Sequence, residues 1–254
     1  MSIVDLDRRF LRWNEKENDA AEIYAVLRHY ARNDLDWPKL LQHHRVVVLA
    51  EAGSGKTEEL REQAQRLVAI GQFGFYATVQ DVGREGLESA IGSASRGRLE
   101  QWRGSDQPAW FFIDSIDEAK FDKVHLDTAL RKLADTFEAA PRRAHLVLSG
   151  RLTDWEFRAD LSRVAQYLPV PPEPKALSAP TPDALLVQVL RGERHEKSDE
   201  KVTAPLVVLM APLDVERVRR FAAAKGVTAL DPFMAAIEDA NLWPLARHHW
   251  IWNG

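Results

Sequence analysis

Hydrophobic residues along this chain fall into short runs that alternate with longer stretches of helical spacing. Five runs rich in β-branched and aromatic residues predict strands at Val46–Ala50, Gly74–Val79, Ala109–Ile113, His145–Ser149 and Pro205–Met210. Between them lie amphipathic stretches, such as 121–139, whose apolar positions recur every three or four residues and predict helices. Strands that alternate with helices indicate an α/β fold, with a parallel five-stranded sheet buried between two layers of helices.

The regions that flank this alternation predict the domain organisation. Residues 4–33 carry apolar positions at helical spacing among many charges, so we expect a short helical N-terminal segment over 1–36 and one main domain over 37–254. Within that domain, 155–204 is rich in proline and charge and is expected to be an irregular insertion after a short helical piece. Asp214 is placed to cap a helix that begins just after it.

The first predicted strand runs directly into a glycine-rich turn. This turn consists of Ala50, Glu51, Ala52, Gly53, Ser54, Gly55, Lys56 and Thr57, and a predicted helix follows it. A strand, a permissive loop and a helix start in this order are typical of a phosphate-binding loop, in which backbone N–H groups surround an anion. Lys56 would contact the β- and γ-phosphates, and the Thr57 hydroxyl would bind Mg²⁺. Ala50 stands where the common pattern has glycine, at a strand end where a small residue suffices.

Further candidate site residues follow two other predicted strands. Asp114 comes directly after the run 109–113 and is a candidate Mg²⁺ ligand, while Asp117 and Glu118 are candidates to orient or deprotonate an attacking water. The run 145–149 leads to Arg151, whose guanidinium suits bidentate contact with a phosphate. Because ligands bind at the carboxyl ends of parallel strands, we expect all of these residues at one edge of the sheet.

Composition restricts the function classes. The chain of 254 residues has no cysteine, which excludes disulfides, thiol nucleophiles and cysteine-ligated metals. Its net charge of −4 and pI near 6.1 give no overall attraction to nucleic acid or to an anionic membrane. No apolar run approaches the roughly 20 residues of a membrane helix, and the charged N-terminus does not look like a signal peptide. We therefore expect a cytoplasmic protein without a membrane or direct nucleic-acid partner.

The three motifs together resemble the NACHT branch of the STAND-class signalling NTPases. The resemblance rests on the turn 50–57, on Phe-Ile-Asp-Ser-Ile-Asp-Glu-Ala at 112–119, and on Leu-Ser-Gly-Arg-Leu-Thr-Asp-Trp at 148–155. The middle segment is the most specific, because in that branch a small residue follows the first aspartate and further acids come three and four positions after it. Ser149 and Arg151 occupy the places of the branch's sensor motif, although Gly150 separates them here.

The resemblance implies a three-layer P-loop NTPase that binds ATP, or GTP, with Mg²⁺ and hydrolyses it slowly. It also implies a switch controlled by the nucleotide, in signalling or defence, whose partners are further copies of the chain or a larger STAND protein. Relatives usually begin with an effector domain and continue into C-terminal winged-helix and sensor modules; we expect a bacterial member without these modules in this sequence, either a stand-alone NTPase module or part of a longer protein. Two other functions stay open: a scaffold that binds nucleotide without turnover, or a truncated partner of a larger STAND protein, and a P-loop kinase of small molecules.

Overall fold

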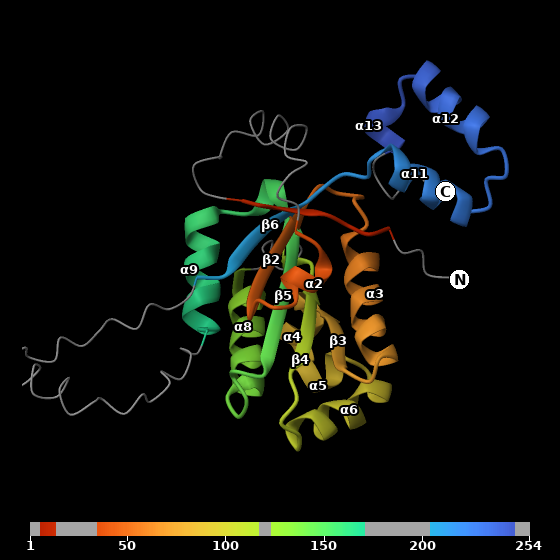
Figure 1. Cartoon of the computed structure of the whole chain (residues 1–254). Coiled ribbons are helices and arrows are strands. Elements are labelled where there is room, and N and C mark those ends of the chain that lie inside the picture. The colour runs from red at the N-terminus through yellow and green to blue at the C-terminus, as the bar shows by residue number, and fades with distance from the viewer. Residues whose placement is uncertain (1–5, 14–34, 117–122, 171–203, 247–254) are drawn as a thin grey trace, which may run out of the picture.

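The computed structural model describes residues 6–13, 35–116, 123–170 and 204–246 of the chain (Figure 1), and all structural statements refer to these residues. The elements in chain order are β1 (Phe10–Arg12), α2 (Trp37–Leu40), β2 (Arg45–Ala50), α3 (Lys56–Ala69), β3 (Phe73–Thr78), α4 (Val79–Glu85), α5 (Leu87–Ala90), α6 (Ser93–Arg103), β4 (Ala109–Asp114), α8 (Lys123–Phe137), β5 (Ala144–Arg151), η2 (Leu152–Asp154), α9 (Phe157–Tyr167), β6 (Leu206–Met210), α11 (Val215–Ala224), α12 (Leu230–Asp239) and α13 (Trp243–Ala246).

The sheet has six strands in the order β1-β6-β2-β5-β4-β3. The strands from β6 to β3 are all parallel, which confirms the predicted α/β architecture and the five predicted strands, but the sheet is six-stranded and mixed rather than five-stranded and parallel. The sixth strand, β1, runs antiparallel to β6 and lies inside the N-terminal segment that was expected to be helical. That expectation is wrong for Phe10–Arg12, because the open edge of β6 offers backbone hydrogen bonds and burial for Phe10 and Leu11. The rest of the stretch 4–33 that was expected to be helical, from residue 14 on, lies outside the described residues.

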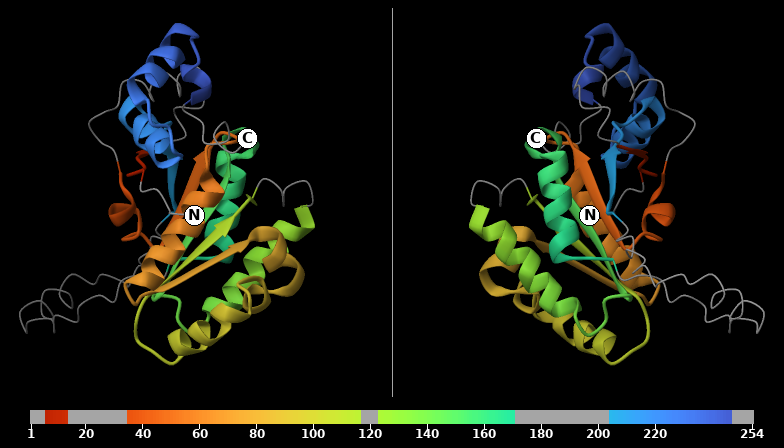
Figure 2. Two further views of the ribbon diagram at one scale, coloured as in Figure 1. Left: turned by 90° about the vertical axis from the view of Figure 1, so that its right-hand side faces the viewer. Right: turned by 90° about the vertical axis from the view of Figure 1, so that its left-hand side faces the viewer.

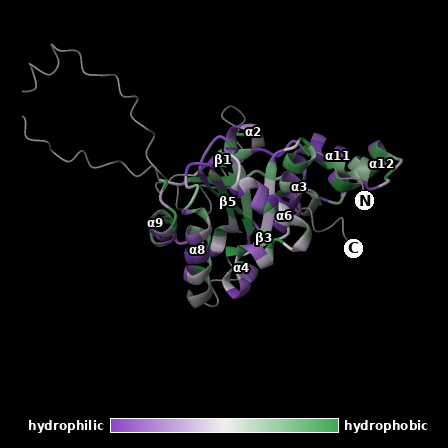
Figure 3. Cartoon of the chain, turned by 90° about the horizontal axis from the view of Figure 1, so that it is seen from below, coloured by the Kyte–Doolittle hydropathy of each residue, from purple (hydrophilic) through white to green (hydrophobic). Residues whose placement is uncertain are grey.

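Helices cover both faces of the sheet (Figures 1 and 2). Successive side chains of each strand point to opposite faces. Val46 and Val48 of β2 face the layer of α2 and α3, whereas Val47 and Leu49 face the layer of α4, α6, α8 and α9. Strands buried on both sides are expected to be largely apolar, and in β2 the five residues from Val46 to Ala50 are apolar and buried; Arg45, at the start of the strand, is buried as well. Figure 3 shows this pattern, with hydrophobic residues along the strands and hydrophilic residues distributed over the helices.

The C-terminal helices form a smaller unit with an apolar centre of its own. Leu213, Val218, Phe221 and Ile237 are buried there together with Leu6 from the start of the described chain. Asp214 caps α11 by accepting a hydrogen bond from the Arg217 N–H at 2.8 Å, as the sequence predicted. Figure 1 shows this unit set apart from the sheet, beyond the end of β6.

The region expected to be an irregular insertion begins with the regular helix α9, and 171–203 lies outside the described residues. None of the helices in the described parts of the chain is long and apolar enough to cross a membrane.

Candidate functional site

The turn between β2 and α3 has the backbone shape that its glycines allow. Gly53 and Gly55 adopt φ values of 72° and 87°, in the left-handed region that favours glycine, and α3 begins at Lys56. No side chain caps the start of α3, whereas Thr78 caps α4 and Asp214 caps α11. The first N–H groups of α3 therefore lack the side-chain acceptor that α2, α4 and α11 have, as do those of α5, α6, α9 and α12, and at the glycine-rich turn an anion can take that place.

Lys56 lies over this turn. Its ammonium group donates hydrogen bonds to the carbonyl oxygens of Ala50 and Glu51, each at 3.1 Å. Thr57 is half-buried in the same first turn of α3. A lysine held by two backbone carbonyls keeps its positive charge close to the uncapped helix start, which adds to the attraction for an anion.

Asp114, the last residue of β4, is 2% exposed and is held by hydroxyl groups from both neighbouring strands. The Ser149 hydroxyl on β5 donates to one carboxylate oxygen, and the Tyr76 hydroxyl on β3 donates to the other at 3.1 Å. Burial raises the pKa of Tyr76, and the negative charge of Asp114 raises it further, so this phenol stays protonated as a donor. The hydroxyls compensate part of the cost of burying the carboxylate and fix its orientation.

The backbone around Asp114 is turned sharply. Ser115 adopts φ of 69°, which is uncommon for a residue with a side chain, and its N–H donates to the Ser149 hydroxyl at 3.2 Å. Ser149 thus accepts from one backbone group while it donates to Asp114. Such a conformation persists only where the surrounding contacts hold it, and it often accompanies functional sites.

The two clusters lie at the same edge of the sheet. Ala50, at the end of β2, is aligned with Arg151, at the end of β5, and the Asp114–Ser149 pair joins β4 to β5 beside them. The helix that follows β2 packs on one face of the sheet and the helix that follows β5 packs on the other. Ligands of open α/β sheets bind in the crevice that such a change of direction creates.

The structure places the predicted site residues as follows. It brings Asp114 against Ser149, and it sets Lys56 and Thr57 in the first turn of α3. Arg151 is exposed at the end of β5. Because residues i and i+2 of a strand point to the same face, and only Gly150 lies between them, Ser149 and Arg151 are on the same face of the sheet. Asp117 and Glu118 lie outside the described residues.

Two residues of this region were missed by the sequence reasoning. Tyr76 stands near the carboxyl end of a predicted strand, so the rule that singled out Asp114 would also have found it. Arg8 is 2% exposed and donates to the Ser54 carbonyl oxygen at 2.8 Å. A buried arginine in the charged stretch near the N-terminus carries no sequence signal of this role.

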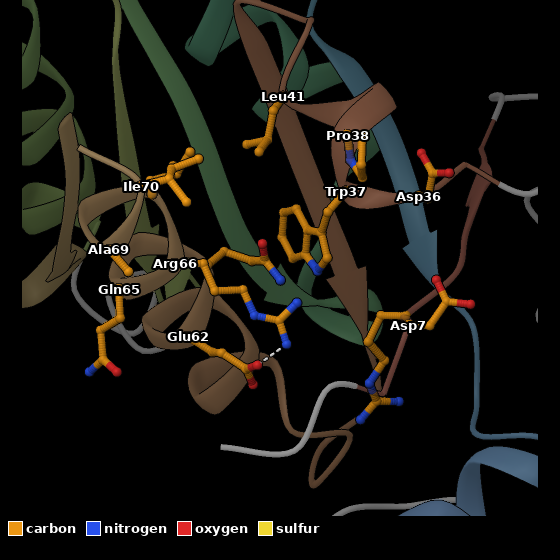
Figure 4. A pocket seen from close by; sticks show the side chains of 13 residues that line it. Asp7, Asp36, Trp37, Pro38, Leu41, Glu62, Gln65, Arg66, Ala69 and Ile70 are labelled. Atoms are coloured by element: carbon orange, nitrogen blue, oxygen red, sulfur yellow. Dashed lines mark hydrogen bonds and ion pairs between the residues drawn. The ribbon is translucent and has the colours of Figure 1, made fainter. Parts of the chain in front are cut away.

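A groove of about 890 Å³ lies away from this site, along α3 (Figure 4). Trp37, Leu41 and Ile70 contribute its apolar lining, and an ion pair between Glu62 and Arg66 stands at its edge. Its lining on α3 begins at Glu62, beyond the first turn of the helix, so the groove is distinct from the crevice at the helix start, although Arg8 also lines it.

Comparisons with known proteins add no assignment: neither models of protein families nor curated proteins match the chain. The site is therefore interpreted from its own chemistry.

Proposed function

We propose that the chain binds a nucleoside triphosphate with Mg²⁺ at the β2–α3 turn and hydrolyses it slowly. The observation that carries this proposal is the uncapped, glycine-shaped start of α3, with Lys56 over it, at the same sheet edge as the buried Asp114–Ser149 pair. A helix start with a lysine suits a polyphosphate, and a preoriented carboxylate beside it suits the divalent cation that accompanies one.

The residues at this edge fit Mg²⁺ by their chemistry. The Thr57 hydroxyl and the Asp114 carboxylate are hard oxygen donors, and the two hydroxyls on Asp114 would hold it in place. Bound Mg²⁺ would neutralise charge on the phosphates and leave them open to attack by water.

The remaining roles fall to residues at the ends of β4 and β5. Asp117 and Glu118 follow β4 in the sequence and would orient the water and accept its proton. Arg151 would contact the terminal phosphate, where a permanent charge and a planar fork of donors stabilise the charge that develops. Together with the motif resemblance, this supports an ATP-dependent, or GTP-dependent, switch of the NACHT type.

The test is nucleotide binding and turnover by the purified chain with ATP and with GTP in Mg²⁺. The Asp117→Ala/Glu118→Ala variant should retain binding and lose turnover, while Glu85→Ala/Glu88→Ala, two acids of α4 and α5, should behave as wild type. Binding without any turnover in the wild type would restrict the function to a nucleotide-bound scaffold. Absence of binding would refute the proposal.

A further inference from the structure

The first described residues of the chain lie between the C-terminal helices and the β2–α3 turn. Leu6 is buried in the apolar centre of the C-terminal unit. Arg217 of α11 donates to the carbonyl oxygens of Leu6 and Asp7 at 3.0 and 2.9 Å, and to the Asp7 carboxylate at 3.1 Å. The position of α11 therefore determines where this segment lies.

The next residue, Arg8, contacts the turn itself. Its guanidinium donates to the Ser54 carbonyl oxygen at 2.8 Å and forms an ion pair with Glu59 of α3 at 3.6 Å. Ser54 stands between Gly53 and Gly55, the two residues with positive φ, so the backbone is most permissive where Arg8 holds it. In a planar trans peptide the C=O and the next N–H point in opposite directions. By fixing the Ser54 carbonyl, Arg8 fixes the direction of the Gly55 N–H.

This contact is built into the interior rather than left on the surface. Glu59, the partner of Arg8, accepts from the Trp37 indole at 2.7 Å and from the Gln63 amide at 3.4 Å. Burial lowers the pKa of Arg8, and the charge of Glu59 opposes that effect. Because Glu59 is held by two donors, the buried guanidinium of Arg8 has one preferred position beside it. A shift of the backbone at Arg8 should therefore also change its contact with Ser54.

The backbone before Arg8 is also constrained. Asp7 has φ of 45°, an uncommon conformation for a residue with a side chain, and its carboxylate accepts from Arg9 at 2.8 Å as well as from Arg217. A conformation of this kind needs its contacts in order to persist. Loss of the Arg217 contacts should therefore let residues 6–8 relax and move Arg8.

We propose that Arg8 is a positioning residue that couples the docking of α11–α13 to the shape of the β2–α3 turn. When the C-terminal helices undock, the hydrogen bond from Arg8 to the Ser54 carbonyl oxygen weakens, and the affinity of the turn for a triphosphate decreases. By linkage, a bound triphosphate stabilises the docked helices by the same factor. The ligand in this statement rests on the proposed function, whereas the coupling of helix to turn does not.

Amide hydrogen exchange of the full, nucleotide-free chain tests the coupling. Arg8→Met and Arg217→Met should each speed exchange in peptides covering 51–60 by about fivefold, the effect of losing one hydrogen bond. The double variant should exchange no faster there than Arg8→Met alone, because both act through one contact. Arg220→Met, an equivalent change on α11 at an arginine that pairs with Glu216, should leave 51–60 unchanged.

Further variants and a binding measurement separate the coupling from folding and from the ligand. Arg8→Lys keeps the charge without the planar fork and should show an intermediate effect, and it replaces Arg8→Met if that variant does not fold. Unchanged exchange at 51–60 in Arg217→Met, or additive effects in the double variant, would overturn the coupling. If wild type binds ATP, Arg217→Met should weaken binding several-fold. If wild type binds no nucleotide, the proposed function fails and the exchange data alone decide the coupling.

Discussion

Ser149 of β5 donates its hydroxyl hydrogen to the carboxylate of Asp114 on β4, so one strand orients the acid of the next. Both residues are almost fully buried, at 0% and 2% exposure, at the edge of the sheet where the β2–α3 turn also lies. The hydroxyl fixes the orientation of the carboxylate, as the outer hydrogen-bond partners of metal-binding carboxylates do.

Ser149→Ala should raise the Mg²⁺ concentration needed for nucleotide binding, with a smaller effect on the stability of the fold. Asp114 would keep the Tyr76 hydrogen bond but lose its partner on the other side, and removal of such an outer partner typically costs ten- to a hundredfold in metal affinity. Titration of nucleotide binding with Mg²⁺ measures the effect. Ser105→Ala, at a serine that caps a turn near α6, is the control, and an unchanged Mg²⁺ midpoint in Ser149→Ala would contradict the role.

Gly74→Ala should destabilise the protein by about 1–3 kcal/mol, as expected for overpacking. A Cβ at Gly74 would lie 2.4 Å from the Ala64 carbonyl oxygen, because β3 and α3 approach each other closely there. Gly150→Ala is the matched control, since its Cβ would meet Ile116 and Leu49 at an ordinary 3.6 Å. Urea denaturation of the two variants measures the difference. Equal stabilities would show that α3 can move away from β3 without cost.

Acid should destabilise wild type more than His145→Gln. His145 packs with ring centroids 5.3 Å from Trp110 and 4.5 Å from His44, and burial lowers its pKa to about 4. In the unfolded chain His145 therefore binds a proton below about pH 6.5, whereas in the folded chain it stays neutral down to about pH 4. Neutral His145 therefore does not reduce the stability of the fold above about pH 6.5. As the pH is lowered from about 6.5 to about 4, the free energy of unfolding decreases by at most about 1.4 kcal/mol per pH unit.

Urea midpoints of wild type and His145→Gln between pH 4 and 7 provide the measurement. The difference between the two curves isolates His145 from the carboxylates, which both proteins share. Parallel curves across this range would contradict the assignment.

The parallel strands were predictable because burial on both faces favours runs of apolar residues, as in Val46–Ala50 and Ala109–Ile113. The strand Phe10–Arg12 was not, because three residues carry no periodicity and this strand exists only through the edge that β6 provides. Asp114 was recognisable from its place after a strand. The hold of Arg8 on Ser54 joins residues 46 positions apart and depends on tertiary burial, which no local pattern encodes.

The most direct test of the central proposal is calorimetric titration of Mg²⁺-ATP and Mg²⁺-GTP into wild type, Lys56→Ala and Lys39→Ala. Lys39 lies in the short helix α2 and provides a matched lysine outside the β2–α3 turn. We expect one site per chain in wild type and in Lys39→Ala, and a loss of at least about a hundredfold in affinity in Lys56→Ala, as when one partner of a charged contact is removed. Equal affinity in Lys56→Ala and wild type, or no binding by any of the three, would contradict the proposal.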